Sequence, residues 1–392
     1  MIDRLSPQAP DALLALIRLH AADPRADKID LGVGVYRTEA GVTPVFAAVK
    51  AAEQVLVDTQ DSKSYLGPEG DMGMVTALMP YIFGAADPTM GGRVAGMQTP
   101  GGTGAVRLAL GLAQKAGVRR VHMGVPSWPN HAQILADLGL ELAPFDHATP
   151  HGEANLDAVL AAIKGAAADD AVLLHACCHN PTGIDYTPDQ WAAITEAFVA
   201  SGTFPIIDSA YQGLGYGMEE DVAGMRLLLS RVPEAFIAHS CDKNFGQYRD
   251  RVGAFYVMAA DPGALDTAFS NANALARAGW SMPPDHGGAV VRIILNDAAL
   301  IAQWQAELDD MRARMRGVRA ALAAAGRVGR IDLTPLGTQS GLFAMLPVTK
   351  DEVTTLREEH GIYMAASGRI NIAGLTSANL PKFIAALAAV AG

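Results

Sequence analysis

The sequence predicts an α/β fold with a mostly parallel sheet and a second, smaller domain. Short apolar runs alternate with amphipathic segments through the middle of the chain, a pattern typical of buried parallel strands joined by helices. From residue 302 the pattern changes to one long helical segment, two short strands and a closing helix, which indicates the second domain. The length of 392 residues suits two or three domains, or one large core with a smaller domain beside it.

The elements follow from the period of the apolar residues. Six apolar runs are predicted as strands of the main sheet: 94–97, 120–124, 171–176, 204–207, 235–238 and 252–259. Helical spacing is found at 104–115, 130–138, 156–164 and 188–200. The last of these has Pro188 at its first position and Asp189 in its first turn, which is typical of a helix start. The second domain is predicted to contain helix 302–325, strands near 341–346 and 369–373, and helix 379–390.

Charge and composition narrow the class of protein. The formal net charge of −11 argues against nucleic acid as a partner, because neutralising phosphates requires an excess of lysine and arginine. No apolar run approaches the roughly 18 residues of a membrane span. The N-terminus carries acidic residues and prolines where a secretion signal needs a basic start and an apolar core. Three cysteines are too few for a disulfide framework. We therefore expect a cytoplasmic protein without membrane contact.

A lysine follows the apolar run 235–238. Lys243 is preceded by Ser240 and followed by Arg251. A lysine in an apolar, cationic neighbourhood loses proton affinity and becomes a nucleophile toward carbonyl groups. Ser240 and Arg251 would then form an anion site for a phosphate. The alternative is a surface ion pair on a loop.

Other predicted strands also end in unusual loops. Residues 99–104, TPGGTG, lead into a helix, and glycines there let backbone N–H groups approach an anion, although a simple helix-entry turn fits equally. Trp128 stands between two prolines, as a stacking surface or a core plug. Asn180 can donate a hydrogen bond. Asp208 ends a very apolar strand with Tyr211 three residues later; it is either a paired buried carboxylate or a helix N-cap.

One cluster also suggests a metal. His175, Cys177, Cys178 and His179 are typical zinc ligands. Four ligands within five consecutive residues cannot close a tetrahedron without severe distortion, so we expect no metal there.

Together these loops resemble the aspartate/aromatic-amino-acid subgroup of the class I aminotransferases, which depend on pyridoxal 5'-phosphate and have fold type I. The resemblance runs from LGVGVYR at 31–37 to GRINIAG at 368–374. Its longest motifs are TPGGTGAVR, PSWPNH, HACCHNPTG, DSAYQG, KNFGQYRDRVGA and ASGRINIAGL. It implies a large cofactor-binding domain at 43–305 with a seven-stranded sheet. A smaller α+β domain would be formed by residues 1–42 and 306–392.

The resemblance implies pyridoxal 5'-phosphate as cofactor, with Lys243, Asp208 and Tyr211 as catalytic residues. Lys243 would hold the cofactor as a Schiff base and move the proton between substrate and cofactor. Asp208 would keep the ring nitrogen protonated. The remaining cofactor contacts would be Trp128 stacked on the ring, Asn180 and Tyr211 on its oxygen, and Gly102, Thr103, Ser240 and Arg251 on the phosphate. Tyr65 would reach the phosphate from the other subunit of a homodimer, and His131 and His175 would support Asp208.

The same resemblance implies amino acids and 2-oxo acids as substrates, exchanged by a ping-pong mechanism. Arg369 would bind the α-carboxylate with its planar guanidinium. Arg277 would reach across the dimer to the distal carboxylate of a dicarboxylic substrate. Gly34, Trp128 and Asn180 would also contact the substrate.

The chain departs from the family at three positions. Asp242 stands where the family usually has a small hydroxyl residue, and a carboxylate beside a phosphate is repulsive unless it points away or meets Arg249 or Arg251. Trp280 and Met282 replace a frequent tyrosine and a frequent asparagine or serine near Arg277. An apolar wall there suits aromatic rings. We therefore expect Tyr, Phe, Asp and Glu as amino donors and 2-oxoglutarate as an acceptor.

Three alternatives remain at this point. The chain could transaminate aspartate alone, or it could be a β-lyase, decarboxylase or racemase on the same scaffold. It could also be a non-catalytic ligand-sensing domain of a DNA-binding regulator. The last would need an additional DNA-binding module, and LGVGVYR already begins at residue 31.

Overall fold

The computed structural model describes residues 2–7 and 12–392. The chain divides into two compact units, one formed by 44–313 and the other by 1–43 and 314–392. The boundary at 313/314 falls inside the long helix α11 (Ala298–Ala324).

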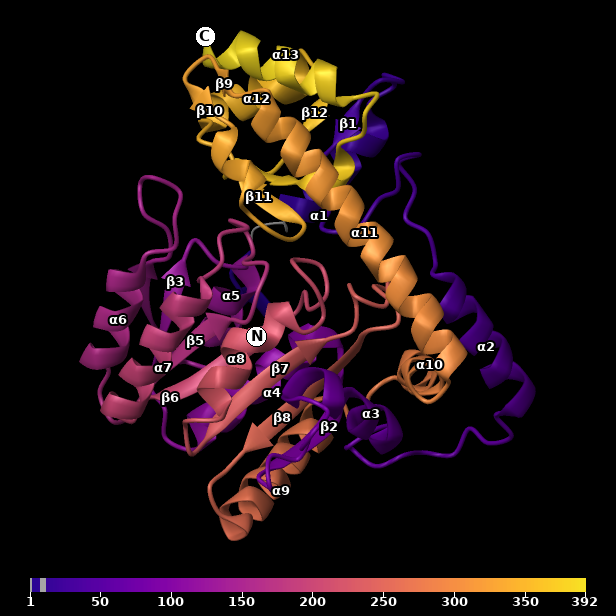
Figure 1. Cartoon of the computed structure of the whole chain (residues 1–392), viewed down its shortest axis with the longest axis vertical. Coiled ribbons are helices and arrows are strands. Elements are labelled where there is room, and N and C mark those ends of the chain that lie inside the picture. The colour runs from indigo at the N-terminus through magenta and orange to yellow at the C-terminus, as the bar shows by residue number, and fades with distance from the viewer. Residues whose placement is uncertain (1, 8–11) are drawn as a thin grey trace. The chain divides into compact units, whose positions relative to one another are not determined.

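The larger unit is built on a seven-stranded sheet (Figure 1). Its order is β2-β8-β7-β6-β5-β3-β4, and every pairing is parallel except the two made by β8. The strands are β2 (Val94–Pro100), β3 (Arg120–Val125), β4 (Glu141–Asp146), β5 (Asp170–His175), β6 (Phe204–Ser209), β7 (Ala235–Ser240) and β8 (Val252–Met258). The predicted mostly parallel seven-stranded sheet is confirmed.

Two features of this sheet differ from the predicted elements. Strand β8 was expected among the parallel strands, but it runs antiparallel to β7 and β2. Eleven residues separate β7 from β8, which is shorter than the crossover that a parallel pair needs. Strand β4, absent from the predicted runs, forms the edge beside β3.

Helices surround the strands as expected for βαβ units. They are α2 (Ala47–Thr59), α3 (Met72–Phe83), α4 (Gly101–Lys115), α5 (Pro129–Asp137), α6 (Leu156–Gly165), α7 (Pro188–Ser201), α8 (Glu220–Leu229), α9 (Pro262–Gly279) and α10 (Asp285–Leu295). Helices α6, α7 and α8 are neighbours in one group, and α4 packs with α5 and α9 in another (Figure 1). Pro188 is the first residue of α7, where Thr187 and Gln190 form a capping box. The predicted helix start is therefore confirmed.

Strand register brings the functional loops to one edge of this sheet. His175 pairs with Asp208, Asp208 pairs with Ala238, and Ser240 pairs with Gly253. Because parallel strands end at the same edge, the segments that follow β2, β3, β5, β6 and β7 begin side by side. Helix α4 starts directly after β2, and ten of its fifteen residues are buried, so its N-terminus is held firmly at that edge.

The smaller unit has its own apolar core. Its elements are η1 (Ile2–Arg4), α1 (Ala12–Ala22), β1 (Ile29–Asp30), β9 (Arg327–Val328), β10 (Ile331–Asp332), η2 (Thr334–Gly337), β11 (Phe343–Met345), α12 (Lys350–Glu358), β12 (Ile362–Tyr363), β13 (Arg369–Asn371), η3 (Ile372–Gly374) and α13 (Leu380–Ala391). Strands β1 and β12 pair in parallel, whereas β11 and β13 pair antiparallel. Among the described residues, no helix is long and apolar enough to cross a membrane.

Candidate active site

A pocket of about 390 Å³, including its open mouth, lies at the carboxyl edge of the sheet in the larger unit. Eight residues predicted from the sequence line it: Gly102, Thr103, Trp128, Asn180, Asp208, Tyr211, Ser240 and Lys243. His175, Ala210 and Asp242 complete the lining. Ala210 was missed because a methyl group carries no chemical signal, although it lies inside the DSAYQG motif.

Lys243 follows β7 and is partly buried in the pocket wall. Burial lowers the pKa of its ammonium group, while the nearby Asp242 and Asp208 carboxylates oppose that shift. Its Nζ lies 5.6 Å from the centre of the Tyr211 ring. A lysine whose ammonium form is disfavoured supplies the neutral amine that attacks a carbonyl carbon.

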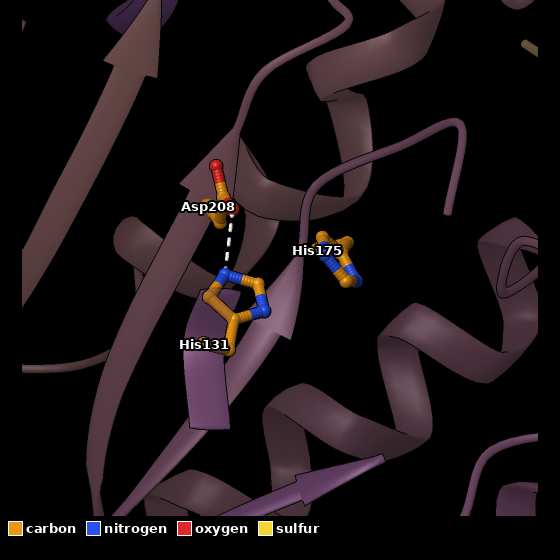
Figure 2. A group of neighbouring side chains, drawn as sticks. All are labelled: His131, His175 and Asp208. Atoms are coloured by element: carbon orange, nitrogen blue, oxygen red, sulfur yellow. Dashed lines mark hydrogen bonds and ion pairs between the residues drawn. The ribbon is translucent and has the colours of Figure 1, made fainter. Parts of the chain in front are cut away.

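Asp208 is a buried member of β6, and its carboxylate accepts a hydrogen bond from Nε2 of His131 at 2.9 Å (Figure 2). Burial is the largest influence and acts to raise the pKa of Asp208, but the His131 hydrogen bond and the electrostatic effects of His131, His175 and Lys243 together hold the pKa below its usual value. His131 in turn contacts Ser127 Oγ through Nδ1 at 3.0 Å. The alternative of Asp208 as a helix N-cap is wrong, because Asp208 lies within β6 and its carboxylate is bonded to the His131 imidazole of α5.

A row of imidazole rings lies behind Asp208. The ring of His175 is 5.2 Å from that of His131 and 4.3 Å from that of His179, which stacks on His147 at 3.5 Å. His131, His175 and Asp208 hold ligand atoms within 4.8 Å of one another (Figure 2), as do Cys177, Cys178 and Asp221. Neither group is the set of four residues at 175–179 that was considered for zinc, and two members of the first group, His175 and Asp208, line the pocket.

Tyr211, Asn180 and Trp128 form the polar and aromatic wall. The Asn180 amide donates to Tyr211 Oη at 3.2 Å, so one hydrogen-bonding unit faces the pocket. Trp128 is partly buried and stands edge-on to His131, with ring centres 5.0 Å apart. Its indole is therefore held in place by packing.

The N-terminus of α4 and the end of β7 form a cradle for an anion. Gly101 adopts φ +70, and a Cβ on Gly102 would lie 2.8 Å from Ser240 Cβ, so only glycine permits this close approach. Unpaired N–H groups at a helix start and the Ser240 hydroxyl are suited to an anion. Of the two interpretations of TPGGTG that the sequence allowed, this geometry favours the anion site over a plain helix entry.

Arg251 does not line the pocket but stands directly behind the cradle. Its Nη1 donates to Asp242 Oδ2 at 2.5 Å and to the Tyr248 carbonyl at 3.0 Å. Its Nη2 would lie 2.4 Å from a Cβ placed on Gly101. The sequence allowed Asp242 either to point away from the phosphate or to pair with Arg249 or Arg251. The structure shows the pair with Arg251.

Tyr65 and Arg277 lie outside this pocket. Tyr65 is 94% exposed, and Arg277, in the last turn of α9, is exposed with its guanidinium donating to Ser281 at 2.6 Å. The segments that carry them are neighbours, since the Leu66 amide contacts Met282 Sδ at 3.0 Å. Trp280 packs partly against the core of the larger unit.

Gly34 and Arg369 belong to the smaller unit. The Arg369 guanidinium lies 4.5 Å from the centre of the Phe343 ring and donates to the Gly32 carbonyl at 3.1 Å. A Cβ on Gly34 would lie 2.6 Å from the same Phe343 ring. Phe343 thus brings the two predicted substrate residues together, a role that nothing in the sequence signalled.

We expect acid to weaken the fold through two buried histidines. Burial lowers the pKa of His175 to about 3 and that of His239 to about 4, whereas both titrate near pH 6.5 when unfolded. Both side chains are therefore neutral in the folded protein. Their contribution to the free energy of unfolding is complete above about pH 6.5 and is lost as the pH falls below that value. Each should reduce the unfolding free energy by about 1.4 kcal/mol per pH unit over that window.

Urea unfolding measured between pH 8 and pH 5 tests this expectation. His239→Asn should reduce the pH slope, whereas His151→Asn, on an exposed turn, should leave it unchanged. A wild-type unfolding free energy that stays constant from pH 7 to pH 5 would contradict it.

Known proteins are similar to this chain over nearly its full length. Residues 26–387 match the family model described as "Aminotransferase class I and II". The chain is 51% identical over 379 residues to the tyrosine aminotransferase of Rhizobium meliloti (strain 1021), covering 96% of this chain and 97% of the relative. It is 40% identical over 395 residues to the aspartate aminotransferase of Escherichia coli (strain K12), covering 100% of both.

The fold is also similar to that of a solved aminotransferase structure. The aromatic-amino-acid aminotransferase of Burkholderia pseudomallei, covalently bound to pyridoxal phosphate, superposes with a TM-score of 0.95 at 34% identity over 100% of both chains. The family model and both relatives span nearly the full length, so the family resemblance seen in the motifs is confirmed. This chain belongs to the class I and II aminotransferase family.

Proposed function

We propose that this chain is a pyridoxal-phosphate-dependent aminotransferase that exchanges amino groups between aromatic or acidic L-amino acids and 2-oxo acids such as 2-oxoglutarate. The observation that carries the proposal is the single pocket that holds Lys243, Asp208 and the cradle at α4. Relatives named for tyrosine and for aspartate both align over nearly the whole chain, which supports both substrate classes.

The pocket fits pyridoxal phosphate on three counts. It has a buried carboxylate for the ring nitrogen, an amine for the aldehyde and a helix N-terminus for the phosphate. Asn180 Oδ1 and His175 Nε2 are buried without a hydrogen-bond partner among the residues that the structure describes. Buried polar atoms of this kind are suited to a polar ligand. When bound, the cofactor supplies an electron sink for carbanion chemistry at the substrate Cα.

Each pocket residue has a distinct role in this proposal. Lys243 would hold the cofactor through its amine, and as a neutral amine it would move the proton at the substrate Cα. Asp208, whose pKa is lowered and whose carboxylate is fixed by His131, would keep the ring nitrogen protonated. The Asn180 amide, which donates to Tyr211 Oη, would together with Tyr211 hydrogen-bond the ring oxygen, and Trp128 would pack on the ring face. Gly102, Thr103 and Ser240 would hold the phosphate in the pocket, and Arg251 would reach it from behind the start of α4.

We propose a homodimer in which Tyr65 and Arg277 complete the site of the other copy. Both are exposed on neighbouring segments of one chain, so one subunit could present them together. In this arrangement Arg277 binds the distal carboxylate of aspartate or glutamate. Arg369 binds the α-carboxylate, close to Gly34.

The two compact units correspond in this proposal to a cofactor-binding domain and a small domain. The expected boundaries, 43–305 against 1–42 and 306–392, lie near those of the units. The three cysteines are free and buried, which is compatible with the proposed cytoplasmic location.

Absorbance spectroscopy tests the proposed activity. The visible band of the cofactor-loaded protein should bleach with glutamate, tyrosine, phenylalanine or aspartate and return with 2-oxoglutarate. Bleaching by aspartate but not by aromatic donors would reduce the function to aspartate transamination. Release of pyruvate or ammonia without an acceptor would instead indicate a lyase or decarboxylase.

Arg277→Ala should separate the two substrate classes. Losing a charge-assisted pair at a desolvated site costs about 2–5 kcal/mol, or roughly 30- to 5,000-fold in kcat/KM for aspartate. Phenylalanine has no distal carboxylate, so its kcat/KM should change little. Steady-state kinetics with both donors measure the ratio, with Arg107→Ala on α4 as a control. Equal losses for both donors would exclude contact between Arg277 and the distal carboxylate.

A further inference from the structure

Asp242 is a buried acid in the wall of the proposed phosphate cradle. It is 1% exposed and lies between Ser240 and Lys243, immediately after β7. Its Oδ1 accepts from the Val252 amide at 3.0 Å, and its Oδ2 accepts from Arg251 Nη1 at 2.5 Å. Both oxygens are therefore fixed in place, and the carboxyl group cannot turn away without losing these partners.

The same carboxyl group reaches the start of α4. Its Oδ2 would lie 2.9 Å from a Cβ on Gly101, and Asp242 lines the pocket with Gly102 and Thr103. A phosphate held by α4 and Ser240 would thus meet a carboxylate in the same wall. Arg251 is already paired with that carboxylate, so the pair brings no net positive charge to the phosphate.

Two neighbouring anions in a poorly solvated site cannot both keep full charge, because each strongly disfavours ionisation of the other. The charged groups that face Asp242 are Lys243 beside it and Arg251 across the turn, and the Cys241 thiol is also near. Burial raises the pKa of Asp242, while Lys243 and Arg251 lower it. An arriving phosphate competes with Asp242 for Arg251 and so favours the neutral acid.

We propose that Asp242 takes up a proton when the phosphate group binds, so that its carboxyl group donates a hydrogen bond to the phosphate. This rests on the function proposed above. The proton comes from the solvent or buffer and is held on an Asp242 oxygen, and no other bond forms or breaks in the step. Asp242 would then make cofactor retention depend on pH.

The linkage has a definite sign. Because the complex holds one more proton than its separated parts, low pH favours binding. Between the pH at which Asp242 loses its proton in the free protein and the higher pH at which it loses it in the complex, the dissociation constant for pyridoxal phosphate should rise about tenfold per pH unit, and above that range it should level off. Asp242→Asn, which donates a hydrogen bond without titrating, should lack that dependence.

Calorimetry on the cofactor-free protein measures the proton directly. Pyridoxal phosphate is titrated at pH 8 in two phosphate-free buffers of different ionisation enthalpy, with wild type and Asp242→Asn. Wild type should take up close to one proton more than the variant. Pyridoxal, which also reacts with Lys243 but lacks the phosphate, measures any difference in protons moved at Lys243, whose pKa the Asp242 carboxylate raises. The extra proton assigned to Asp242 is the difference that remains after this pyridoxal value is subtracted.

Phosphorus NMR of the bound cofactor then locates the proton. The phosphate should be a dianion in both proteins, because the proton is on Asp242. Equal proton uptake by wild type and variant, or a monoanionic phosphate in wild type, would overturn the inference. If Asp242→Asn does not fold, Asp242→Ser and the wild-type comparison of pyridoxal phosphate with pyridoxal carry the same test.

The result also separates this inference from the proposed function. Failure of pyridoxal phosphate to bind at all would overturn the function. Tight binding with no extra proton would overturn only the role of Asp242.

Discussion

Lys243→Ala is expected to lower the transamination rate by at least about 10⁴-fold while the protein remains folded. The substitution removes both the amine that attaches the cofactor and the base that moves the Cα proton. Lys243 lies at the pocket wall after β7, so its removal leaves the sheet and the core intact. Single-turnover assays with glutamate measure the loss, and circular dichroism checks the fold.

Lys164→Ala is the matched control. Lys164 is an exposed lysine in the last turn of α6, away from the pocket lining, and its loss should leave the rate unchanged. If Lys243→Ala kept more than a few per cent of the wild-type rate, the assignment of the attaching lysine would be wrong.

Asp208→Asn is expected to lower kcat by about 10²–10³-fold, the loss typical of removing one preorganised electrostatic contact. The asparagine preserves the shape of the side chain but not the charge. Without a carboxylate, the ring nitrogen of the bound cofactor has no anion to keep it protonated, and the proton at the substrate Cα becomes harder to remove. Stopped-flow spectroscopy of the amino-donor half-reaction measures the effect.

A second buried aspartate provides the comparison. Asp221 accepts hydrogen bonds from the amides of Gly213, Gly215 and Tyr216 and does not line the pocket. Asp221→Asn should therefore reduce stability but leave kcat per folded molecule unchanged. Similar losses of kcat for the two variants would mean that Asp208 acts only as a structural residue.

The sequence predicted the pocket well because its residues follow apolar strands. Asp208, Asn180 and Lys243 each stand within a few residues of a buried run. Parallel strands end at a common edge, so these side chains had to converge. The rule that parallel strands end at one edge and the family motifs both predicted the pocket at the carboxyl edge of the sheet.

Other features could not be read from the same pattern. Strand β4 has no buried residue along its six positions, all of them described, and therefore produced no apolar run. An apolar run such as β8 does not encode its direction, which depends on the length of the preceding turn. The pairing of Asp242 with Arg251 depends on how that turn folds, since nine positions separate them.

Residues expected to act across a dimer mark another limit. Tyr65 and Arg277 were assigned from motifs alone, and in a single chain they are exposed side chains. Their roles depend on a second copy of the chain, whose position no local pattern encodes.

Reduction of the cofactor-loaded protein with borohydride, followed by peptide mass spectrometry, tests the central claim most directly. Borohydride makes an imine link between cofactor and lysine permanent, and the chain has eight lysines among which the label can choose. The label should be found on the peptide that contains Lys243 and on no other. A label on any of the other seven lysines, or no label at all, would contradict the account.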